Sequence, residues 1–336
     1  MKRALPLLAL ALTACASTAP ARPAAGPPVR AGTTQTSPTT ASTAVGPARL
    51  AALRWSAGAP LPRAVSEVGV AALGTDVHVL GGYVDGHPGS TTHLVLDTRT
   101  GRWHSAAPLP AVRDHVGAVA LDGRLYAVGG FGPTPGGTAT TWVWDPGTDR
   151  WRSLAPLPGR RAAGVAVALD GRLHYVGGKR AGRDTGEHDV YDPATNRWST
   201  AAPMPTARDH AAGAVVGTRL YVAAGRPGEL RTVEAYDPTT DRWATLPPLP
   251  AGRSSLAGAA LDGRFVVLGG EDAGERNVVA DVDAYDPATR RWTRLSGLPA
   301  PRQGIGAAVV GGRLFVPGGG PTAGGSRQAD TLMVLG

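Results

Sequence analysis

The stretch 103–151 reads WHSAAPLPAVRDHVGAVALDGRLYAVGGFGPTPGGTATTWVWDPGTDRW, and most of the chain repeats it with variations. A period near fifty residues with a di-glycine and a late tryptophan is typical of a propeller blade rather than of a helical solenoid. The equivalent tryptophans are separated by 48, 48, 47, 45 and 49 residues and are Trp55, Trp103, Trp151, Trp198, Trp243 and Trp292. The sequence therefore predicts an all-β propeller.

Each repeat is expected to form four antiparallel strands. The first strand is small and apolar, as in VGAVAL (116–121), which suits an innermost position where strands from all blades converge. A two-residue turn such as Asp122-Gly123 follows, and this pair favours a type I′ hairpin. The second strand ends in a di-glycine such as Gly129-Gly130. A variable loop then leads to the third strand, and an Asp-Pro-x-Thr turn leads to the fourth, which carries the tryptophan.

The number of strands at the two ends predicts how the ring closes. Residues 50–55 supply a fourth strand with Trp55, whereas residues 302–335 supply three strands and stop. Pairing the two ends completes one blade and removes the open edge of a linear array. We therefore expect residues 50–336 to form one domain, a six-bladed propeller closed by the N-terminal strand joining the C-terminal blade.

The repeat resembles the kelch repeat in its di-glycine, in the tyrosine of the third strand (Tyr191, Tyr236, Tyr285) and in the tryptophan of the fourth. This resemblance covers residues 50–336 and implies a kelch-type β-propeller. Leu96 and Trp144 stand where the other units have tyrosine, which should alter packing without changing the architecture.

The first 49 residues indicate export. Residues 1–15 place Lys2-Arg3 before an apolar run and the sole cysteine, Cys15, as in a secretory leader. The sequence LTAC (12–15) resembles the bacterial lipobox, which implies lipidation of Cys15. The alternative is an ordinary signal peptide. Residues 16–49 lack hydrophobic periodicity and are expected to be a disordered Ala/Thr/Pro/Ser tether. We expect an extracytoplasmic protein attached to the bacterial membrane by its lipid anchor alone, or secreted if the lipobox is not used.

The net charge of +8 is a weak argument for nucleic-acid binding. Five basic residues and no acidic ones precede residue 50, so the remainder carries only about +3. Its basic residues are not clustered among aromatic ones, and we expect no nucleic-acid partner. Because Cys15 is the only cysteine, disulfides, thiolate metal clusters and the copper chemistry of galactose oxidase are excluded. We expect no cofactor.

An arginine precedes the inner strand in five of the six units, in the motif Leu/Met-Pro-x-x-Arg. All these positions should lie on one rim around the channel mouth, where guanidinium groups suit carboxylate or phosphate recognition. Val65 breaks the pattern in the first unit. The predicted anion-binding residues are Arg113, Arg161, Arg208, Arg253 and Arg302. The alternative is that these arginines belong to the scaffold and bond to neighbouring blades.

Residues that differ between otherwise equal units are the best candidates for function. Glu67, His115 and His210 are such residues on this rim, and they are the candidate acid/base groups. His115 and His210 occupy equivalent positions on blades two and four, with Ala163 between them on blade three. That spacing is expected to be poor for one metal ion, so no metal site is predicted.

The leading interpretation is a non-enzymatic module that recognises a protein or an anionic carbohydrate through its loop-rich face. The alternative is a carbohydrate-active enzyme. Bacterial sialic acid mutarotases are similar to this chain as secreted six-bladed kelch propellers, and their reaction needs an acid/base group and an anion-binding arginine. A deep pocket gathering Glu67 or a histidine with two arginines would favour the enzyme, and a broad shallow surface the binding module.

Overall fold

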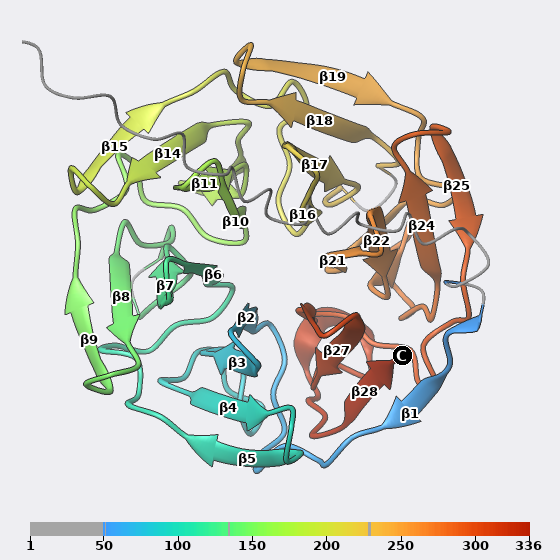
Figure 1. The fold of residues 1–336 in the computed structure, drawn as a ribbon, viewed down its shortest axis with the longest axis horizontal. Helices are drawn as coiled ribbons and strands as arrows, with labels where there is room; N and C mark the ends of the chain where they lie inside the picture. Colours follow the sequence, from blue (N-terminus) through green and yellow to red (C-terminus); the bar gives the residue numbers. More distant parts are fainter. Residues whose placement is uncertain (1–49, 51, 134, 228–229) are drawn as a thin grey trace, which may run out of the picture. The chain divides into compact units, whose positions relative to one another are not determined.

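The protein is a six-bladed β-propeller in a computed structural model that describes residues 50, 52–133, 135–227 and 230–336 (Figure 1). The described residues form six four-stranded antiparallel sheets and two two-stranded ribbons. The predicted signal peptide (1–15) and tether (16–49) lie outside the described residues. Within the described part, no helix is long and apolar enough to cross a bilayer. The predicted fold class is confirmed.

The blades are numbered along the chain, and their strands are given from the channel outwards. Blade 1 contains β2 (Gly69–Leu73), β3 (Asp76–Leu80), β4 (His93–Asp97) and β5 (Arg102–Ser105). Blade 2 contains β6 (Gly117–Leu121), β7 (Arg124–Val128), β8 (Thr141–Asp145) and β9 (Arg150–Ser153). Blade 3 contains β10 (Val165–Leu169), β11 (Arg172–Val176), β14 (His188–Asp192) and β15 (Arg197–Thr200), with the ribbon β12 (Lys179–Arg180) and β13 (Arg183–Asp184).

Blade 4 contains β16 (Ala212–Val216), β17 (Arg219–Ala223), β18 (Val233–Asp237) and β19 (Arg242–Leu246). Blade 5 contains β21 (Ala257–Leu261), β22 (Arg264–Leu268), β24 (Val282–Asp286) and β25 (Arg291–Arg294), with the ribbon β20 (Arg253–Ser254) and β23 (Glu271–Asp272). Blade 6 contains β26 (Ala308–Val310), β27 (Arg313–Pro317), β28 (Leu332–Leu335) and β1 (Trp55–Ala57), and the 3-10 turn η1 (Ala323–Gly325) follows β27.

Blade 6 closes the ring as predicted. Strand β1 pairs antiparallel with β28, with Trp55 opposite Leu335. The strand begins at Trp55, so the predicted strand 50–55 is displaced towards the C-terminus. The Trp55 indole N–H also donates to the carbonyl of Ser296, which follows the last strand of blade 5, at 2.9 Å. The N-terminal strand thus contacts both blades at the junction and covers the edge that β28 would otherwise expose.

The other repeat tryptophans make the same bond to the preceding blade. Each indole N–H donates to a backbone carbonyl at 2.8 to 3.0 Å, and the pairs are Trp103–Ala59, Trp151–Ala107, Trp198–Ala155, Trp243–Ala202 and Trp292–Pro247. A buried indole that finds a partner for its N–H adds apolar contact without leaving a polar group unpaired. The repeated tryptophan is therefore a contact between blades.

Small side chains of the inner strands line the channel, which contains an open cavity of about 390 Å³. The larger apolar side chains pack between adjacent sheets, as where Phe265 of blade 5 lies 5.8 Å from Tyr221 of blade 4, measured between ring centroids. This distribution agrees with the expectation that Gly, Ala and Val suit the crowded centre.

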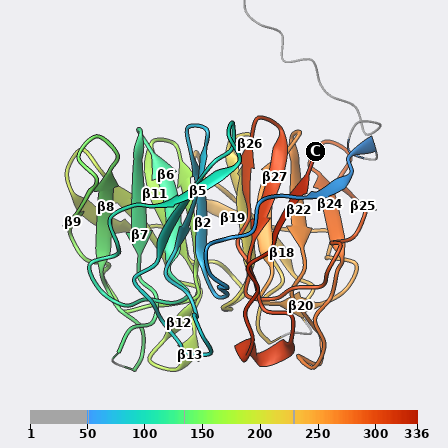
Figure 2. The ribbon, with the colours of Figure 1, turned by 90° about the horizontal axis from the view of Figure 1, so that it is seen from below.

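The di-glycines form the second contact between blades. The Gly82 N–H donates to the Arg113 carbonyl of the next blade at 2.9 Å. Both Gly81 and Gly82 have positive φ, and a Cβ on Gly82 would lie 2.4 Å from the Ser66 carbonyl oxygen. Only glycine fits such a conformation and approach. Every blade repeats this bond, so the di-glycines and the starts of the inner strands share one face, which we call the loop face. Figure 2 shows it at the lower edge, near β12 and β13.

Candidate functional site

Six residues, one from each blade, form a closed ring at the channel mouth on the loop face. The N–H of each donates to the carbonyl of its counterpart in the preceding blade, at 2.7 to 3.2 Å. This mouth ring consists of Glu67, His115, Ala163, His210, Ser255 and Gly304. All six have φ between 50° and 57°, which costs roughly 1 to 3 kcal/mol for each residue other than glycine. The hydrogen-bonded ring fixes this conformation, and the structure places all three predicted acid/base candidates on it.

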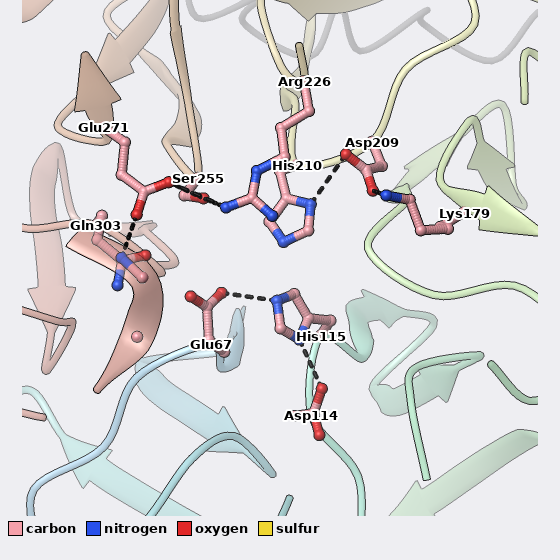
Figure 3. A network of polar contacts seen from close by, with 12 residues as sticks. Glu67, Asp114, His115, Lys179, Asp209, His210, Arg226, Ser255, Glu271 and Gln303 are labelled. Carbon is pink, nitrogen blue, oxygen red and sulfur yellow. Dashed lines mark hydrogen bonds and ion pairs between the residues drawn. The ribbon is translucent and has the colours of Figure 1, made fainter. Parts of the chain in front are cut away.

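The mouth ring brings together side chains that are far apart in the sequence (Figure 3). His115 Nε2 lies 2.9 Å from a carboxylate oxygen of Glu67, and the His115 and His210 rings meet edge to face with centroids 4.7 Å apart. This differs from the wide spacing expected for histidines on blades two and four. The backbone ring is so small that blade 3, which contributes only Ala163 there, does not keep the two imidazole groups apart.

Each histidine has a carboxylate behind it, supplied by the aspartate that precedes it in the chain. Asp114 lies 2.6 Å from Nδ1 of His115, and Asp209 lies 3.1 Å from Nδ1 of His210. Both aspartates are buried. The hydrogen bond to Asp114 orients the His115 imidazole, whereas Asp209 lies within ion-pair distance of His210 but off the direction of a hydrogen bond. In both residues the other ring nitrogen is directed towards the centre of the mouth (Figure 3).

The charges of these groups follow from their neighbours. Burial alone would raise the pKa of Glu67, but the charge and hydrogen bond of His115 outweigh it and lower this pKa to about 2. Burial lowers the pKa of His115, yet Glu67 and Asp114 raise it to about 10. Burial lowers the pKa of His210, and Asp209 offsets only part of that effect. At neutral pH the mouth therefore holds an ion pair, Glu67 with His115, beside an uncharged imidazole.

A second set of six residues surrounds the mouth ring. Each directly follows a di-glycine or its variant and pairs with the residue that precedes a mouth-ring position, as in the bridge between Asp209 and Arg226. This loop ring consists of Tyr83, Phe131, Lys179, Arg226, Glu271 and Gly320. Sequence reasoning missed these residues as site candidates, although their constant place after the di-glycine was available as a signal.

The charged members of the loop ring are bonded to one another or to the mouth. Arg226 Nη2 donates to Glu271 at 3.0 Å and Arg226 Nε lies 3.4 Å from Glu275. Lys179 Nζ lies 3.1 Å from Asp209, within ion-pair distance although off the direction of a hydrogen bond. Cations and carboxylates thus alternate around the mouth.

These two rings line a cavity of about 280 Å³ that opens on the loop face. Glu67, His115 and His210 form its floor, and they also line a smaller cavity of about 100 Å³ that leads towards the channel. Tyr83 and Phe131 lie beside His115, with ring centroids 5.8 and 5.3 Å from the imidazole. The structure therefore shows a pocket, rather than a flat surface, where the predicted candidates converge.

The five predicted anion-binding arginines are not part of this pocket. Each has at most 9% of its surface exposed. Arg161, Arg208 and Arg253 form ion pairs with Asp189, Glu234 and Asp283 of the third strand of their own blades. This geometry corresponds to the scaffold alternative.

In five of the six blades the residue on the third strand matches the residue at the arginine position, whereas in blade 6 Met333 occupies this place and Arg302 bonds to Pro301 and Thr331 instead. Arg113, which has no carboxylate opposite it, lies over the ring of Trp142 with 4.6 Å between the guanidinium carbon and the ring centroid. In blade 1, Val65 takes the place of arginine and the third strand supplies Leu94. A buried cation is tolerated where a carboxylate or an aromatic face compensates its lost hydration.

Comparisons with known proteins agree with the fold. A family model described as "KLHDC2/KLHL20/DRC7 Kelch-repeats domain" matches residues 48–225, and the Kelch motif matches residues 207–250 and 252–299. No curated protein matches the chain. The solved structure of YjhT is similar with a TM-score of 0.70 and 20% sequence identity, over 82% of this chain and 95% of that one. At this identity the likeness concerns the fold alone.

Proposed function

The chain belongs to the kelch-repeat family, and we propose that its loop-face pocket binds a small, hydroxyl-rich ligand of the size of a monosaccharide. The pocket of about 280 Å³ lies near the lower end of the range for small-molecule sites. A ligand of this size reaches the mouth ring, whereas a flat protein surface does not.

The observation that carries the proposal is the alternation of donors and acceptors around the mouth. A hydroxyl group donates one hydrogen bond and accepts others, so it suits a site that offers both. Arg226 and Lys179 only donate, and the carboxylates of Glu67 and Asp209, which line the same pocket, only accept. A site for a strongly charged ligand would instead present an excess of one sign.

Two aromatic rings add an apolar wall. Tyr83 and Phe131 are half-buried on the same side of the pocket as His115. Burial and the charges of Asp114 and Glu67 raise the pKa of Tyr83 to about 12, so its hydroxyl keeps its proton and can donate. An aromatic face next to hydrogen-bonding groups fits the apolar C–H face and the hydroxyls of a sugar.

Calorimetric titration with a panel of neutral and carboxylate-bearing monosaccharides tests the proposal. We expect one sugar class to bind at one site per chain, and Arg226→Met to weaken it at least about tenfold because a charge-assisted hydrogen bond is lost. The matched control is Arg219→Met. Arg219 belongs to the same blade and also pairs with a carboxylate, Asp237, but stands at the opposite end of β17.

Two results would contradict the proposal: no member of the panel binds, or Arg219→Met weakens binding as much as Arg226→Met. Thermal melts of both variants show whether either loss comes from unfolding. The panel also distinguishes the two kinds of sugar. Binding of only the carboxylate-bearing members would support the anionic carbohydrate expected from the sequence, and binding of the neutral members would support recognition through hydroxyls alone.

A second candidate function is catalysis of the sialic acid mutarotase kind. One observation favours it: Glu67, His115 and His210 line the same pocket as Arg226. The first three residues are groups for proton transfer, and the arginine places a cation beside them. Only one arginine lies there, and it is none of the five predicted ones. Exchange of α and β anomers, followed by NMR at chemical equilibrium, detects this activity. Exchange no faster than in buffer would leave the pocket as a binding site.

A further inference from the structure

Three side chains of the mouth ring each present one metal-ligating atom to the same point. A carboxylate oxygen of Glu67 and one imidazole nitrogen each of His115 and His210 all lie within 4.8 Å of one another. Figure 3 shows the three side chains extending from different blades towards the same open space. We propose that Glu67, His115 and His210, which form the floor of the pocket, also form a binding site for a divalent transition-metal ion.

The distances are close to those that an ion requires. In a tetrahedral site with ligand atoms about 2.1 Å from the ion, neighbouring ligand atoms lie roughly 3.4 Å apart, so a pair near the 4.8 Å limit must approach by up to about 1.4 Å through rotation of the side chains. The three side chains are only 8 to 9% exposed, so they are held in the mouth and do not extend into solvent.

The groups behind the two imidazoles support this assignment. Histidines that bind metals usually donate their other ring N–H to a carboxylate, which fixes the tautomer and directs the lone pair at the ion. Asp114 accepts such a hydrogen bond from His115, with 2.6 Å between the atoms, and Asp209 lies 3.1 Å from Nδ1 of His210, close to this position but off the direction of a hydrogen bond. Each Asp-His pair is a dipeptide at the equivalent position of its blade. The same placement of a carboxylate beside an imidazole therefore occurs in blade 2 and in blade 4.

A hydrogen-bonded polar ring without a metal explains only part of this arrangement. It accounts for the contact between Glu67 and His115, which are already paired. It does not account for His210, which is buried beside its own aspartate and has its second nitrogen directed at the same open space (Figure 3). When an ion replaces the proton of His115, the carboxylates of Glu67, Asp114 and Asp209 and the ammonium group of Lys179 leave an excess of two negative charges at this place. A dication would compensate this excess.

The donor set indicates the class of ion. Two imidazoles and one carboxylate, with no thiolate, suit Zn²⁺ or Fe²⁺ better than Mg²⁺ or Ca²⁺, which prefer oxygen ligands. The remaining ring positions, Ala163, Ser255 and Gly304, carry small side chains or none. They leave the side of the ion that faces the pocket open, as in sites that bind water or an exogenous ligand at the metal.

Metal binding to the untagged full chain tests the inference. After dialysis against a chelator, the protein is titrated with Zn²⁺ by calorimetry and with Co²⁺ by visible absorption. We expect one ion per chain. Loss of an outer-shell carboxylate through Asp209→Asn should weaken Zn²⁺ by about 10- to 100-fold, and loss of a ligand through His210→Ala or Glu67→Ala should weaken it further.

The matched control is Ser255→Ala, which changes the same ring position in a blade that supplies no ligand and should leave the affinity unchanged. Alanine already occupies this position in blade 3, as Ala163, so His210→Ala is expected to fold, and a thermal melt verifies it. A wild-type protein that takes up no stoichiometric Zn²⁺ or Co²⁺, or a His210→Ala variant that binds as tightly as wild type, would overturn the site. Sugar binding by Arg226 is measured separately and does not depend on this outcome.

Discussion

His115 and His210 face each other across the channel mouth and meet edge to face, with ring planes at 73° and ring centroids 4.7 Å apart. The two residues are 95 positions apart in the sequence and belong to blades that are not adjacent. The backbone ring of six hydrogen bonds brings them together. A change that alters this backbone ring or adds bulk to it should therefore affect the site directly, and we consider first the position that has no side chain.

Gly304→Ala should disturb the Glu67 carboxylate while leaving the fold intact. A Cβ at Gly304 would lie 2.5 Å from a carboxylate oxygen of Glu67, which must then move. The backbone itself accepts alanine here, since Ala163 has φ 55° at the equivalent place and Gly304 has φ 57°. We expect Zn²⁺ affinity to fall about tenfold or more, with a small change in melting temperature. Unchanged affinity would show that Glu67 is not a ligand.

The sequence predicted the fold because its signals are local and repeat in every unit. The spacing of the tryptophans, the di-glycines and the Asp-Gly turns each specify one blade, and the strands at the two termini specify closure. The start of the closing strand was predicted too early, at residue 50, because residues 50–54 carry no turn signal. In the structure the strand begins at Trp55.

The site could be predicted only in part. Glu67, His115 and His210 stand out as differences within a repeat, but the distance between them depends on the radius of the closed ring, which no local pattern encodes. Arg226 and Lys179 lie in loops whose charges are most simply explained by solvation. The arginine motif illustrates the opposite case. It is plain in the sequence, but its partners Asp189, Glu234 and Asp283 lie 26 to 30 residues further on and are not marked there.

The pair Arg208 and Glu234 should stabilise blade 4 only while both members are present. Arg208 Nη2 lies 3.0 Å from Glu234, and both side chains are buried. Arg208→Met leaves an uncompensated carboxylate and should lower the free energy of unfolding by about 3 to 5 kcal/mol. The double variant Arg208→Val with Glu234→Leu copies blade 1, where Val65 and Leu94 occupy these places, and should recover most of that loss.

Urea unfolding of the two single variants and the double variant measures the coupling between Arg208 and Glu234. If the arginine served a ligand instead, Arg208→Met would keep wild-type stability, and the double variant would gain nothing over it.

Loss of the closing strand should be far more damaging than loss of the segment that precedes it. A chain beginning at residue 58 lacks Trp55, its bond to Ser296 and the pairing of β1 with β28. Trp55 is half-buried, and its loss together with its hydrogen bond and the pairing of β1 should cost about 3 kcal/mol or more, so we expect the melting temperature to fall by roughly 5 °C or more. A chain beginning at residue 50 is the control and should melt as wild type does. Equal melting of the two truncations would refute closure by β1.

We propose that the chain is exported and anchored through Cys15, which lies outside the described residues. Cys15→Ala should release the protein from bacterial membranes without changing its melting temperature, because a single acyl-modified cysteine is the only anchor expected. Metabolic labelling with a fatty acid, followed by membrane fractionation, measures this. Wild-type protein that incorporates no label would contradict the anchor and leave an ordinary signal peptide.

The buried histidine pairs outside the site should make the fold sensitive to mild acid. His78 Nδ1 lies 3.0 Å from His93 Nε2, and His174 and His188 repeat this contact at 2.8 Å in blade 3. Burial lowers the pKa of His78 and His188 to about 3 and that of His93 and His174 to about 4. Below about pH 6.5 the unfolded chain binds protons that the folded chain does not, so stability must fall as the pH decreases.

The expected loss between pH 6.5 and 4.5 is on the order of a few kcal/mol, measured by urea unfolding at each pH. The pair of Glu67 and His115 does not obscure it. His115 stays protonated across this range, and the contribution of Glu67 is lost only below its ordinary pKa of 4.5. The double variant His174→Tyr with His188→Val copies Tyr221 and Val233 of blade 4, which occupy the same strand positions. Its stability should depend less steeply on pH than that of wild type, and an identical dependence would show that this pair is not responsible.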